Sequence, residues 1–455
     1  MKAFMLAGTN SGCGKTTITL GVMMALKRRG LSIQPYKVGP DYIDTAWHTA
    51  ACARASRNLD AYMLPSNALD ATFYNNLRDV DVGVIEGVMG LYDGFGIDHL
   101  HCSSAGMALT IGCPVILVVD GKATSTSAAA VVMGFCHMEP ELAIAGVIFN
   151  QVNSDYHYQL LKGAVEKYCD VPVLGRVPKL KQVRMPERHL GLVTAEECGD
   201  TLSQWSELVD AIEEHVDLDQ LLSVSELADK PASLDFADSI VGTGSGLTVA
   251  IAKDEAFNFY YQDNIDLLKK SGLSITYFSP LHDSHLPECD MIYLGGGYPE
   301  LYAQQLSTNT TMREQINRAH QLNKAIYAEC GGLMYLGDAF VDNENNAHPM
   351  LGILSGQSTM TDKLQRFGYC EATAGVDSLL GSKGATIRGH EFHYSNFETE
   401  LAPVFTFKKG RVGIKDQEWS GGYQVGNTFA SYLHVHFSQQ PEMIAHWIKR
   451  ARMEK

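Results

Sequence analysis

The stretch Ala7-Gly-Thr-Asn-Ser-Gly-Cys-Gly-Lys-Thr-Thr17 decides the fold of the first half of the chain. It follows an apolar run at residues 3–7, which predicts a strand, and it precedes an amphipathic run at residues 18–29, which predicts a helix. A glycine-rich loop that joins a strand to a helix and ends in Gly-Lys-Thr is typical of a P-loop. The sequence therefore predicts a binding site for a phosphate chain at the start of this helix.

The residues of this loop have separate expected roles in binding a nucleotide. Backbone N–H groups and the positive end of the helix dipole would surround the phosphates. The Lys15 ammonium can reach the outer phosphates, and the Thr16 hydroxyl can bind Mg²⁺. We expect the nucleotide, ATP, to be bound by Gly12, Gly14, Lys15, Thr16 and Thr17.

Length and composition limit the class of protein. The chain has 455 residues, of which 45% are hydrophobic and 19% charged, so it is long enough for two or three globular domains. Its net charge of −16 argues against nucleic acid as a partner, since a phosphate backbone requires a basic surface. The 10 cysteines include no C-x-x-C pair, which favours a reduced, cytoplasmic protein. No signal peptide is expected, because Met1-Lys2 is followed at once by a core strand. No membrane partner is expected, because no apolar run approaches the roughly 20 residues that span a bilayer.

The order of apolar runs predicts two α/β domains. Strands are expected at residues 3–7, 33–38, 82–86, 114–120, 143–150 and 172–177, alternating with helical patterns as in a mostly parallel sheet. A second series of strands begins at residues 247–252, and residues 350–437 are richer in strand patterns. We therefore expect a first domain at residues 1–198, a helix and linker at 199–245, and a second domain at 246–455.

Four carboxylates follow strands of the first domain. Asp41 and Asp44 come directly after the second strand, Glu86 ends the third, and Asp93 lies in a glycine-flanked loop soon afterwards. Ligands of parallel sheets bind at the carboxyl ends of the strands, which is where the P-loop also lies. Asp41 and Glu86 are thus candidate Mg²⁺ ligands beside Thr16, and Asp44 and Asp93 are candidates for contact with a substrate. A helix cap or a solvated loop is the alternative for each.

The second domain contains a candidate nucleophile. Cys330 stands between an apolar strand at residues 325–328 and two glycines that open a helix pattern, which is the context of a strand-to-helix elbow. A helix N-terminus at this place is expected to lower the thiol pKa. Gly296 and Gly297 follow another strand and could offer N–H groups to an oxyanion.

The base that activates such a cysteine is expected to be a histidine far away in the sequence. His434 and His436 alternate along one strand, so only one of them can face Cys330. His390 and His393 are competing candidates.

Taken together, these motifs resemble those of the cobyrinic acid a,c-diamide synthase family. Besides the P-loop, the resemblance rests on Lys37-Val-Gly-Pro-Asp-Tyr-Ile-Asp-Thr-Ala-Trp-His48, Val84-Ile-Glu-Gly-Val-Met-Gly-Leu-Tyr-Asp-Gly94, Leu294-Gly-Gly-Gly-Tyr-Pro-Glu-Leu-Tyr302, Ala328-Glu-Cys-Gly-Gly332 and Tyr432-Leu-His-Val-His-Phe437. The motifs occur in the family's order and cover nearly the whole chain. The P-loop has Thr9 where the strict pattern has glycine, and this shift is usual in the ATPase group to which the family belongs.

The resemblance implies a dethiobiotin-synthetase-like ATPase domain joined to a glutamine amidotransferase domain of class I type. The implied reaction is ATP-dependent amidation of the a and c side-chain carboxylates of cobyrinic acid through an acyl phosphate, with L-glutamine as the source of ammonia. By position, Cys330 would be the nucleophile and His434 the catalytic histidine. Class I enzymes have a glutamate two residues after this histidine, but this chain has His436, so a third triad member stays open.

Two kinds of alternative remain at this stage. Close relatives perform the same chemistry on hydrogenobyrinic acid or on nickel–sirohydrochlorin, and the motifs report the activation chemistry better than the ring. A P-loop switch ATPase with a non-catalytic second domain is the alternative from another class, although such a protein does not need the elbow at Cys330. A homodimer is one option for the assembly.

Overall fold

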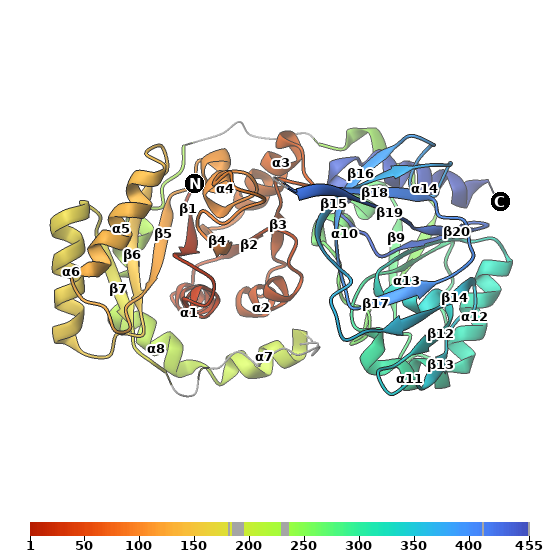
Figure 1. Cartoon of the computed structure of the whole chain (residues 1–455), viewed down its shortest axis with the longest axis horizontal. Coiled ribbons are helices and arrows are strands. Elements are labelled where there is room, and N and C mark those ends of the chain that lie inside the picture. The colour runs from red at the N-terminus through yellow and green to blue at the C-terminus, as the bar shows by residue number, and fades with distance from the viewer. Residues whose placement is uncertain (181–182, 184–194, 229–235, 412–413, 454–455) are drawn as a thin grey trace. The chain divides into compact units, whose positions relative to one another are not determined.

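The computed structural model describes residues 1–180, 183, 195–228, 236–411 and 414–453. Contacts divide the described residues into a first compact unit of residues 1–61, 66–180, 183 and 195–228 and a second of residues 62–65, 236–411 and 414–453. Each unit is an α/β unit with its own sheet system (Figure 1). In the described part of the chain, no helix is both long and apolar enough to cross a membrane.

The first unit is built on a seven-stranded sheet in which every neighbouring pair is parallel. Its strands, in spatial order, are β3 (Arg57–Leu59), β2 (Ile33–Val38), β4 (Val82–Gly90), β1 (Ala3–Gly8), β5 (Val115–Asp120), β6 (Ile144–Asn150) and β7 (Val173–Val177). All six residues of β1 are buried, as expected for a strand covered on both faces. The six strands expected from the sequence are confirmed, whereas β3 is too short and too polar to be recognised from its pattern.

Helices cover both faces of this sheet. They are α1 (Lys15–Arg28), α2 (Ile43–Cys52), α3 (Ser66–Leu77), α4 (Ser104–Ile111), α5 (Ser127–Met138) and α6 (Asp155–Cys169). Figure 1 shows α1 and α2 on one face and α3 and α4 on the other. The loops that follow β1, β2 and β4 therefore meet at one edge of the sheet, which is the edge expected to bind the nucleotide.

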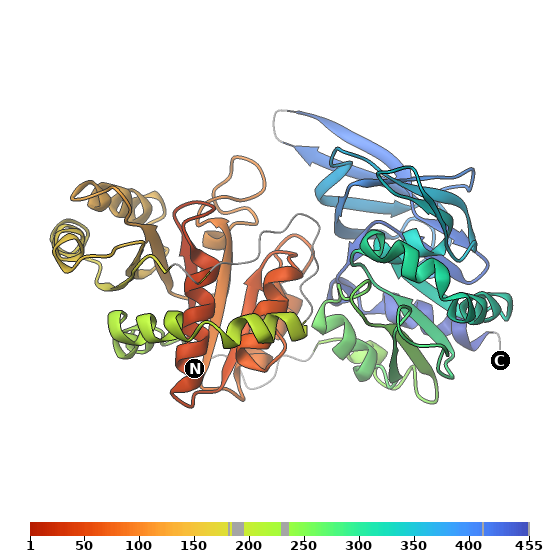
Figure 2. The same cartoon turned by 90° about the horizontal axis from the view of Figure 1, so that it is seen from below.

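Part of the stretch expected as helix and linker packs on the first unit. It contains α7 (Ala195–Ser203), α8 (Ser206–His215) and α9 (Leu218–Ser223), and α8 crosses α1 in Figure 2. Gly21 permits this crossing, because a Cβ there would lie 2.9 Å from Leu208 Cγ. The Leu227 N–H also donates to the Met1 carbonyl at 2.9 Å. Residues 195–228 are therefore part of the first folded unit, and the exact domain boundaries stay a prediction.

The second unit is built on a six-stranded sheet. Its spatial order is β20 (Tyr423–Val425), β21 (Thr428–Ser431), β11 (Ala325–Glu329), β10 (Met291–Leu294), β8 (Thr248–Ala252) and β9 (Ser274–Phe278), with only the β20–β21 pair antiparallel. Alternate residues of β11 enter two cores, since Tyr327 packs with Trp447 on one face while Ile326 packs with Leu333 on the other. The helices of this unit are α10 (Gln262–Lys270), α11 (Ala303–Thr308), α12 (Thr310–Gln321), α13 (Gly331–Leu336) and α14 (Glu442–Arg452).

Two smaller sheets account for the strand-rich region expected at residues 350–437. One contains β13 (Ala347–Pro349), β12 (Gly337–Val341), β14 (Leu354–Met360) and β17 (Ser395–Glu398). The other contains β19 (Ile414–Gly421), β18 (Phe405–Arg411), β15 (Arg366–Ala374), β16 (Thr386–His393) and β22 (His434–Val435). In Figure 2 the blue hairpin of β18 and β19 extends beyond the rest of this unit. The pairing of β16 with β22 is the feature that positions His434.

Candidate active site

The P-loop connects β1 to α1 with two glycines in the left-handed region. Gly12 has φ 83° and Gly14 has φ 92°, a conformation that glycine adopts without steric cost. A Cβ at Gly14 would lie 2.0 Å from Asn150 Nδ2, and Asn150 donates to the Cys13 carbonyl at 2.9 Å. Gly14 caps α1 without a side chain, so no side chain covers the first N–H groups of this helix. The loop is therefore shaped to receive an anion.

Glu86 is the centre of a buried charge cluster at the helix start. Its carboxylate accepts from Thr16 Oγ1 at 2.6 Å and from Lys37 Nζ at 3.1 Å, and it lies 2.7 Å from His48 Nε2 and 3.6 Å from Lys15 Nζ. Burial alone would raise the pKa of Glu86, but Lys37 and His48 outweigh it and hold the pKa well below its usual range. Glu86 is therefore an anion placed against the P-loop lysine and threonine, as the sequence predicted.

The three aspartates of this region differ in their contacts. Asp41 caps α2, since its Oδ1 accepts from the N–H groups of Ile43 at 2.6 Å and Asp44 at 3.0 Å. Asp44 joins the Glu86 cluster through an ion pair of 2.7 Å with Lys37. Asp93 is exposed and accepts from the Gly90 N–H at 2.8 Å. Their expected roles with metal and substrate stay predictions.

The donor atoms at this edge of the sheet are compatible with Mg²⁺. The Thr16 hydroxyl and the Glu86 carboxylate touch, and both are oxygen donors of the kind that Mg²⁺ prefers. Among the described residues, no group of three or more His, Cys, Asp or Glu side chains could hold a metal alone. This arrangement fits a cation whose remaining ligands are phosphate and water oxygens, rather than a metal that is bound by protein side chains alone.

His48 is a residue of this cluster that the sequence analysis did not identify. It lies on α2 one turn after Asp44, is fully buried, and binds Glu86 through Nε2 while Nδ1 lies 3.3 Å from Ser56 Oγ. A fully buried histidine beside a carboxylate stabilises the anionic form of that carboxylate. The only signal in the sequence was a histidine one turn after an aspartate.

Cys330 occupies a strained turn between β11 and α13. Its backbone has φ 45° and ψ −100°, an uncommon conformation for a residue with a side chain. The Cys330 N–H donates to the Ser431 carbonyl at 2.8 Å, and the Gly332 N–H donates to the Gly295 carbonyl at 3.1 Å. The expected elbow is therefore present. The expected lowering of the thiol pKa is wrong, because burial, together with the carboxyls of Glu300 and Glu391, raises the pKa of Cys330 far above its usual value.

Three consecutive glycines, Gly295–Gly297, follow β10 and are tightly packed by their neighbours. A Cβ at Gly295 would lie 2.4 Å from Tyr260 Cζ, one at Gly296 would lie 2.5 Å from His434 Cε1, and one at Gly297 would lie 2.1 Å from the Ala256 carbonyl oxygen. Only glycine fits at these positions without displacing a neighbour. Of the predicted oxyanion residues, Gly296 is thus beside the predicted base, and the nitrogen of Gly297 lies 3.3 Å from the place of a Cβ at Gly331, the residue after Cys330.

Of the two histidines expected on one C-terminal strand, only His434 lies on a strand, because β22 ends at Val435 and His436 precedes a short 3-10 turn. His434 is buried, pairs with His390 across β22 and β16, and has its ring 4.9 Å from that of His390. Burial, with a contribution from His393, lowers the pKa of His434 to about 3. His393 stacks on Tyr432 with ring centroids 3.8 Å apart. A neutral imidazole at His434 can accept a proton.

Glu329 is a second residue that the sequence analysis missed. Its Oε1 accepts from Tyr327 Oη at 2.6 Å and from the Val435 N–H at 3.4 Å, and its Oε2 lies 3.8 Å from His434 Nδ1. Burial raises the pKa of Glu329 to about 8. A charged residue at the end of an otherwise apolar strand, directly before Cys330, was the signal available in the sequence.

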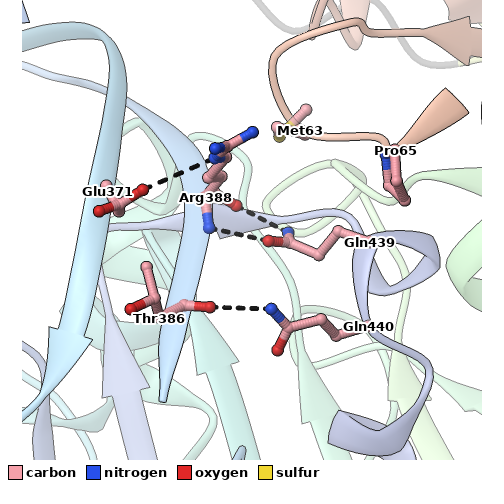
Figure 3. A pocket seen from close by; sticks show the side chains of 7 residues that line it. All are labelled: Met63, Pro65, Glu371, Thr386, Arg388, Gln439 and Gln440. Carbon is pink, nitrogen blue, oxygen red and sulfur yellow. Dashed lines mark hydrogen bonds and ion pairs between the residues drawn. The ribbon is translucent and has the colours of Figure 1, made fainter. Parts of the chain in front are cut away.

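Two glutamines fix the segment that follows His434. Figure 3 shows Gln439 pairing with the Arg388 backbone, from which it accepts at 2.8 Å and to which it donates at 2.7 Å. Gln440 Nε2 donates to the Thr386 carbonyl at 3.0 Å. Both contacts are made to β16, the strand that pairs with β22, so they hold the histidine strand in register.

Substitution of Gly296 by alanine tests the packing of this site. The added Cβ would overlap His434 Cε1, so the ring must move, and we expect glutamine hydrolysis to fall by about 10²-fold. Gly375→Ala is the matched control, because a Cβ there meets only the Val404 carbonyl at 3.5 Å. The measurement is glutamate release by each variant. Wild-type rates in Gly296→Ala would contradict the assignment.

Comparison with known proteins agrees with the division into two units. Residues 4–193 match the family described as the CobQ/CobB/MinD/ParA nucleotide binding domain. Residues 248–442 match the CobB/CobQ-like glutamine amidotransferase domain. The P-loop and Glu86 lie in the first match, and Cys330, Glu329 and His434 lie in the second.

Curated relatives match over almost their full length. The chain is 57% identical over 450 residues to a cobyrinate a,c-diamide synthase of Salmonella typhimurium, with 99% of this chain and 98% of that protein covered. Proteins of the same name from Listeria monocytogenes serotype 4b and Streptococcus sanguinis are 52% and 50% identical, each with 98% of both chains covered.

Proposed function

The chain belongs to the cobyrinate a,c-diamide synthase family, and from this premise we propose that it amidates the a and c side-chain carboxylates of cobyrinic acid. ATP activates each carboxylate, and glutamine supplies the nitrogen. The observation that supports this most strongly is the full-length match at 57% identity, within which the P-loop and the Cys330 elbow both have the expected geometry. A P-loop switch ATPase would not require the second of these features.

The first unit would carry out the activation step. A carboxylate is a poor electrophile, and phosphoryl transfer from ATP converts it to an acyl phosphate, from which ammonia displaces phosphate. Lys15 and the N–H groups of residues 12–17 would stabilise the charge on the transferring phosphoryl group. Asp44 and Asp93 are our candidates for contact with the substrate or intermediate. Lys37 holds Asp44 beside the cluster, which keeps one of these carboxylates near the phosphates.

Mg²⁺ belongs to this proposal as the partner of ATP. Thr16 and Glu86 would bind it, with Asp41 contributing directly or through water. When bound, the ion supplies positive charge that offsets the charge of the phosphates. The protein's own part is to present the two oxygen donors side by side, which the 2.6 Å contact between Thr16 and Glu86 supports.

The second unit would release ammonia from glutamine. Cys330 Sγ attacks the side-chain amide carbon, its proton passes to His434, and His434 returns a proton to the nitrogen as the C–N bond breaks. Water then hydrolyses the thioester to glutamate. The N–H groups of the Gly296–Gly297 region would bind the oxyanion of each tetrahedral intermediate.

The cellular setting is also part of the proposal. All 10 cysteines are free thiols, which is consistent with a reducing compartment, and we propose that the enzyme is cytoplasmic. A homodimer stays a prediction that light scattering of the purified protein would test.

Mass spectrometry of the product tests the proposed reaction. The protein is incubated with cobyrinic acid, glutamine and Mg-ATP, and we expect a diamide that does not form when ATP is left out. Glutamate release without any diamide would support glutamine hydrolysis by the second unit and exclude cobyrinic acid as the substrate. In that case hydrogenobyrinic acid and nickel–sirohydrochlorin are the next substrates to test.

A further inference from the structure

We propose that Glu329 is the positioning residue for His434, replacing the glutamate that class I amidotransferases carry two residues after the catalytic histidine. In this role its carboxylate accepts the Nδ1–H of His434, which leaves Nε2 unprotonated and able to take the proton of the Cys330 thiol. The inference rests on the proposed function, since it assigns a role within the glutamine half of that reaction. The chain has His436 at the position where class I enzymes have the triad glutamate, so Glu329 would complete the triad from another strand.

The geometry of the buried pair of Glu329 and His434 supports this proposal. Glu329 and His434 are 1% and 2% exposed, and Glu329 Oε2 lies 3.8 Å from His434 Nδ1. The other oxygen of the carboxyl is held by Tyr327 and by the N–H of Val435, the residue after His434. The carboxyl is thus fixed with one oxygen directed at the imidazole. Hydrogen bonds between catalytic groups often tighten when the substrate is bound.

Connectivity places the three groups together. Glu329 is the last residue of β11 and Cys330 follows it, so one strand end supplies both the carboxyl and the nucleophile. Glu329 pairs in register with Ser431 of β21, and the chain then continues directly to His434. The carboxyl therefore reaches the histidine from the nucleophile's strand rather than from the histidine's own strand.

His436 does not take the position of the missing glutamate. Its ring stacks on Tyr261 with centroids 4.8 Å apart, and its Nε2 lies 4.0 Å from Asp263 Oδ2. Its Nδ1 accepts from the Ser438 N–H at 3.3 Å. These contacts tie His436 to the segment that leads into α10, away from Glu329. They also provide a second buried histidine–carboxylate pair, which serves as a control.

The tautomer of His434 explains what Glu329 contributes. A carboxylate can only accept, so it places the imidazole proton on Nδ1. The thiol proton can then move to Nε2, and the resulting imidazolium is stabilised by the adjacent negative charge. When nitrogen leaves as ammonia, that proton is returned from Nε2, and His434 is neutral again. No proton needs to pass to Glu329 in this cycle.

The test is Glu329→Gln, assayed by glutamate release and by ammonia-dependent amidation. The amide can still accept from Tyr327, but its NH₂ group would face Nδ1 and place the imidazole proton on Nε2. We expect the kcat for glutamine to fall by about 10²- to 10⁴-fold with KM within about threefold. Ammonia-dependent amidation should be unchanged, since it does not need His434. Asp263→Asn is the matched control and should leave kcat within about threefold.

The pH profile gives a readout that a structural role would not change. Within the residues that the structure describes, five titratable groups face Glu329. They are Tyr327 and Cys330 from its own strand and turn, Tyr293 on β10, Tyr260 before α10, and His434. The ring of His434 in turn faces His390 and His393 on β16. Because burial raises the pKa of Glu329 to about 8, the carboxylate fraction increases with pH through this value. Glutamate release should rise through about pH 8 in the wild type, and Glu329→Gln should lack this rise.

Each outcome decides between the possibilities. Wild-type kcat in Glu329→Gln, or an equal loss in Asp263→Asn, would overturn the proposal. If Glu329→Gln also loses ammonia-dependent amidation, it is misfolded, and Glu329→Asp replaces it, with at least about a tenth of wild-type kcat expected because a carboxylate is retained. Folded Glu329→Asp as inactive as Cys330→Ala would count against the role. Failure of the wild type to amidate cobyrinic acid would affect the proposed function alone, since glutamate release still tests Glu329.

Discussion

Cys330→Ala should lose glutamine-dependent amidation by at least about 10⁴-fold while retaining amidation with added ammonia. Alanine has no nucleophile for the amide of glutamine, whereas ammonia from solution bypasses the whole second unit. The elbow at Cys330 supports this expectation, because its backbone turn with φ 45° places the residue at the start of α13, where the Gly332 N–H donates to the Gly295 carbonyl. The measurement compares the rates of diamide formation with glutamine and with ammonium salt.

A second cysteine of the same unit provides the matched control. Cys289 is also buried, but it packs in the hydrophobic core with Ile292 and Ile316 and has no proposed role in catalysis. Cys289→Ala should retain both activities, apart from a small loss of stability from the removed sulfur. If Cys330→Ala keeps glutamine-dependent activity, another nucleophile must operate. If it loses the ammonia-dependent reaction as well while remaining folded, the assignment of separate reactions to the two units is wrong.

Lys15→Ala should abolish amidation with either nitrogen source, with a loss of about 10³-fold or more. Its ammonium is the cation of the P-loop that can reach the phosphates, and it lies 3.6 Å from the buried Glu86 carboxylate. Loss of Lys15 leaves Glu86 in contact with Lys37 and His48, so the fold should persist. The measurement is the rate of ATP-dependent diamide formation with saturating ammonia.

Lys27 of the same helix is the control for Lys15. Its Nζ donates to the Ala51 carbonyl at 3.0 Å at the far end of α1, away from the P-loop. Lys27→Ala should change the rate by less than about threefold, because the lost contact contributes only to the packing of α1 on α2. Glutamate release should persist in Lys15→Ala, since Cys330 and His434 belong to the other unit. Near-normal amidation by Lys15→Ala would refute the role of the P-loop in activation.

Local sequence determined the elements that bear the chemistry. The apolar runs predicted the principal strands, and the Gly-Lys-Thr and Cys-Gly-Gly turns predicted which strand ends would be reactive, since each motif needs only its own backbone conformation. The roles of Thr16, Glu86 and Cys330 could be proposed because glycine placement and strand ends are features of adjacent residues, whereas the choice of His434 rested on the resemblance to a known family. The length of β4 beyond Glu86 and the short β3 were missed, because propensity is weak at the ends and edges of sheets.

Only the tertiary structure decided which of these strand ends and turns come together to form each site. Thr16 and Glu86 are 70 residues apart in the chain, and they touch because β1 and β4 are parallel neighbours. Glu329 approaches His434 across more than a hundred residues, because β11 pairs with β21 and β22 follows directly. The raised pKa of Cys330 likewise depends on burial by distant segments. Long-range strand order and desolvation depend on the packing of the whole chain, so no local pattern specifies them.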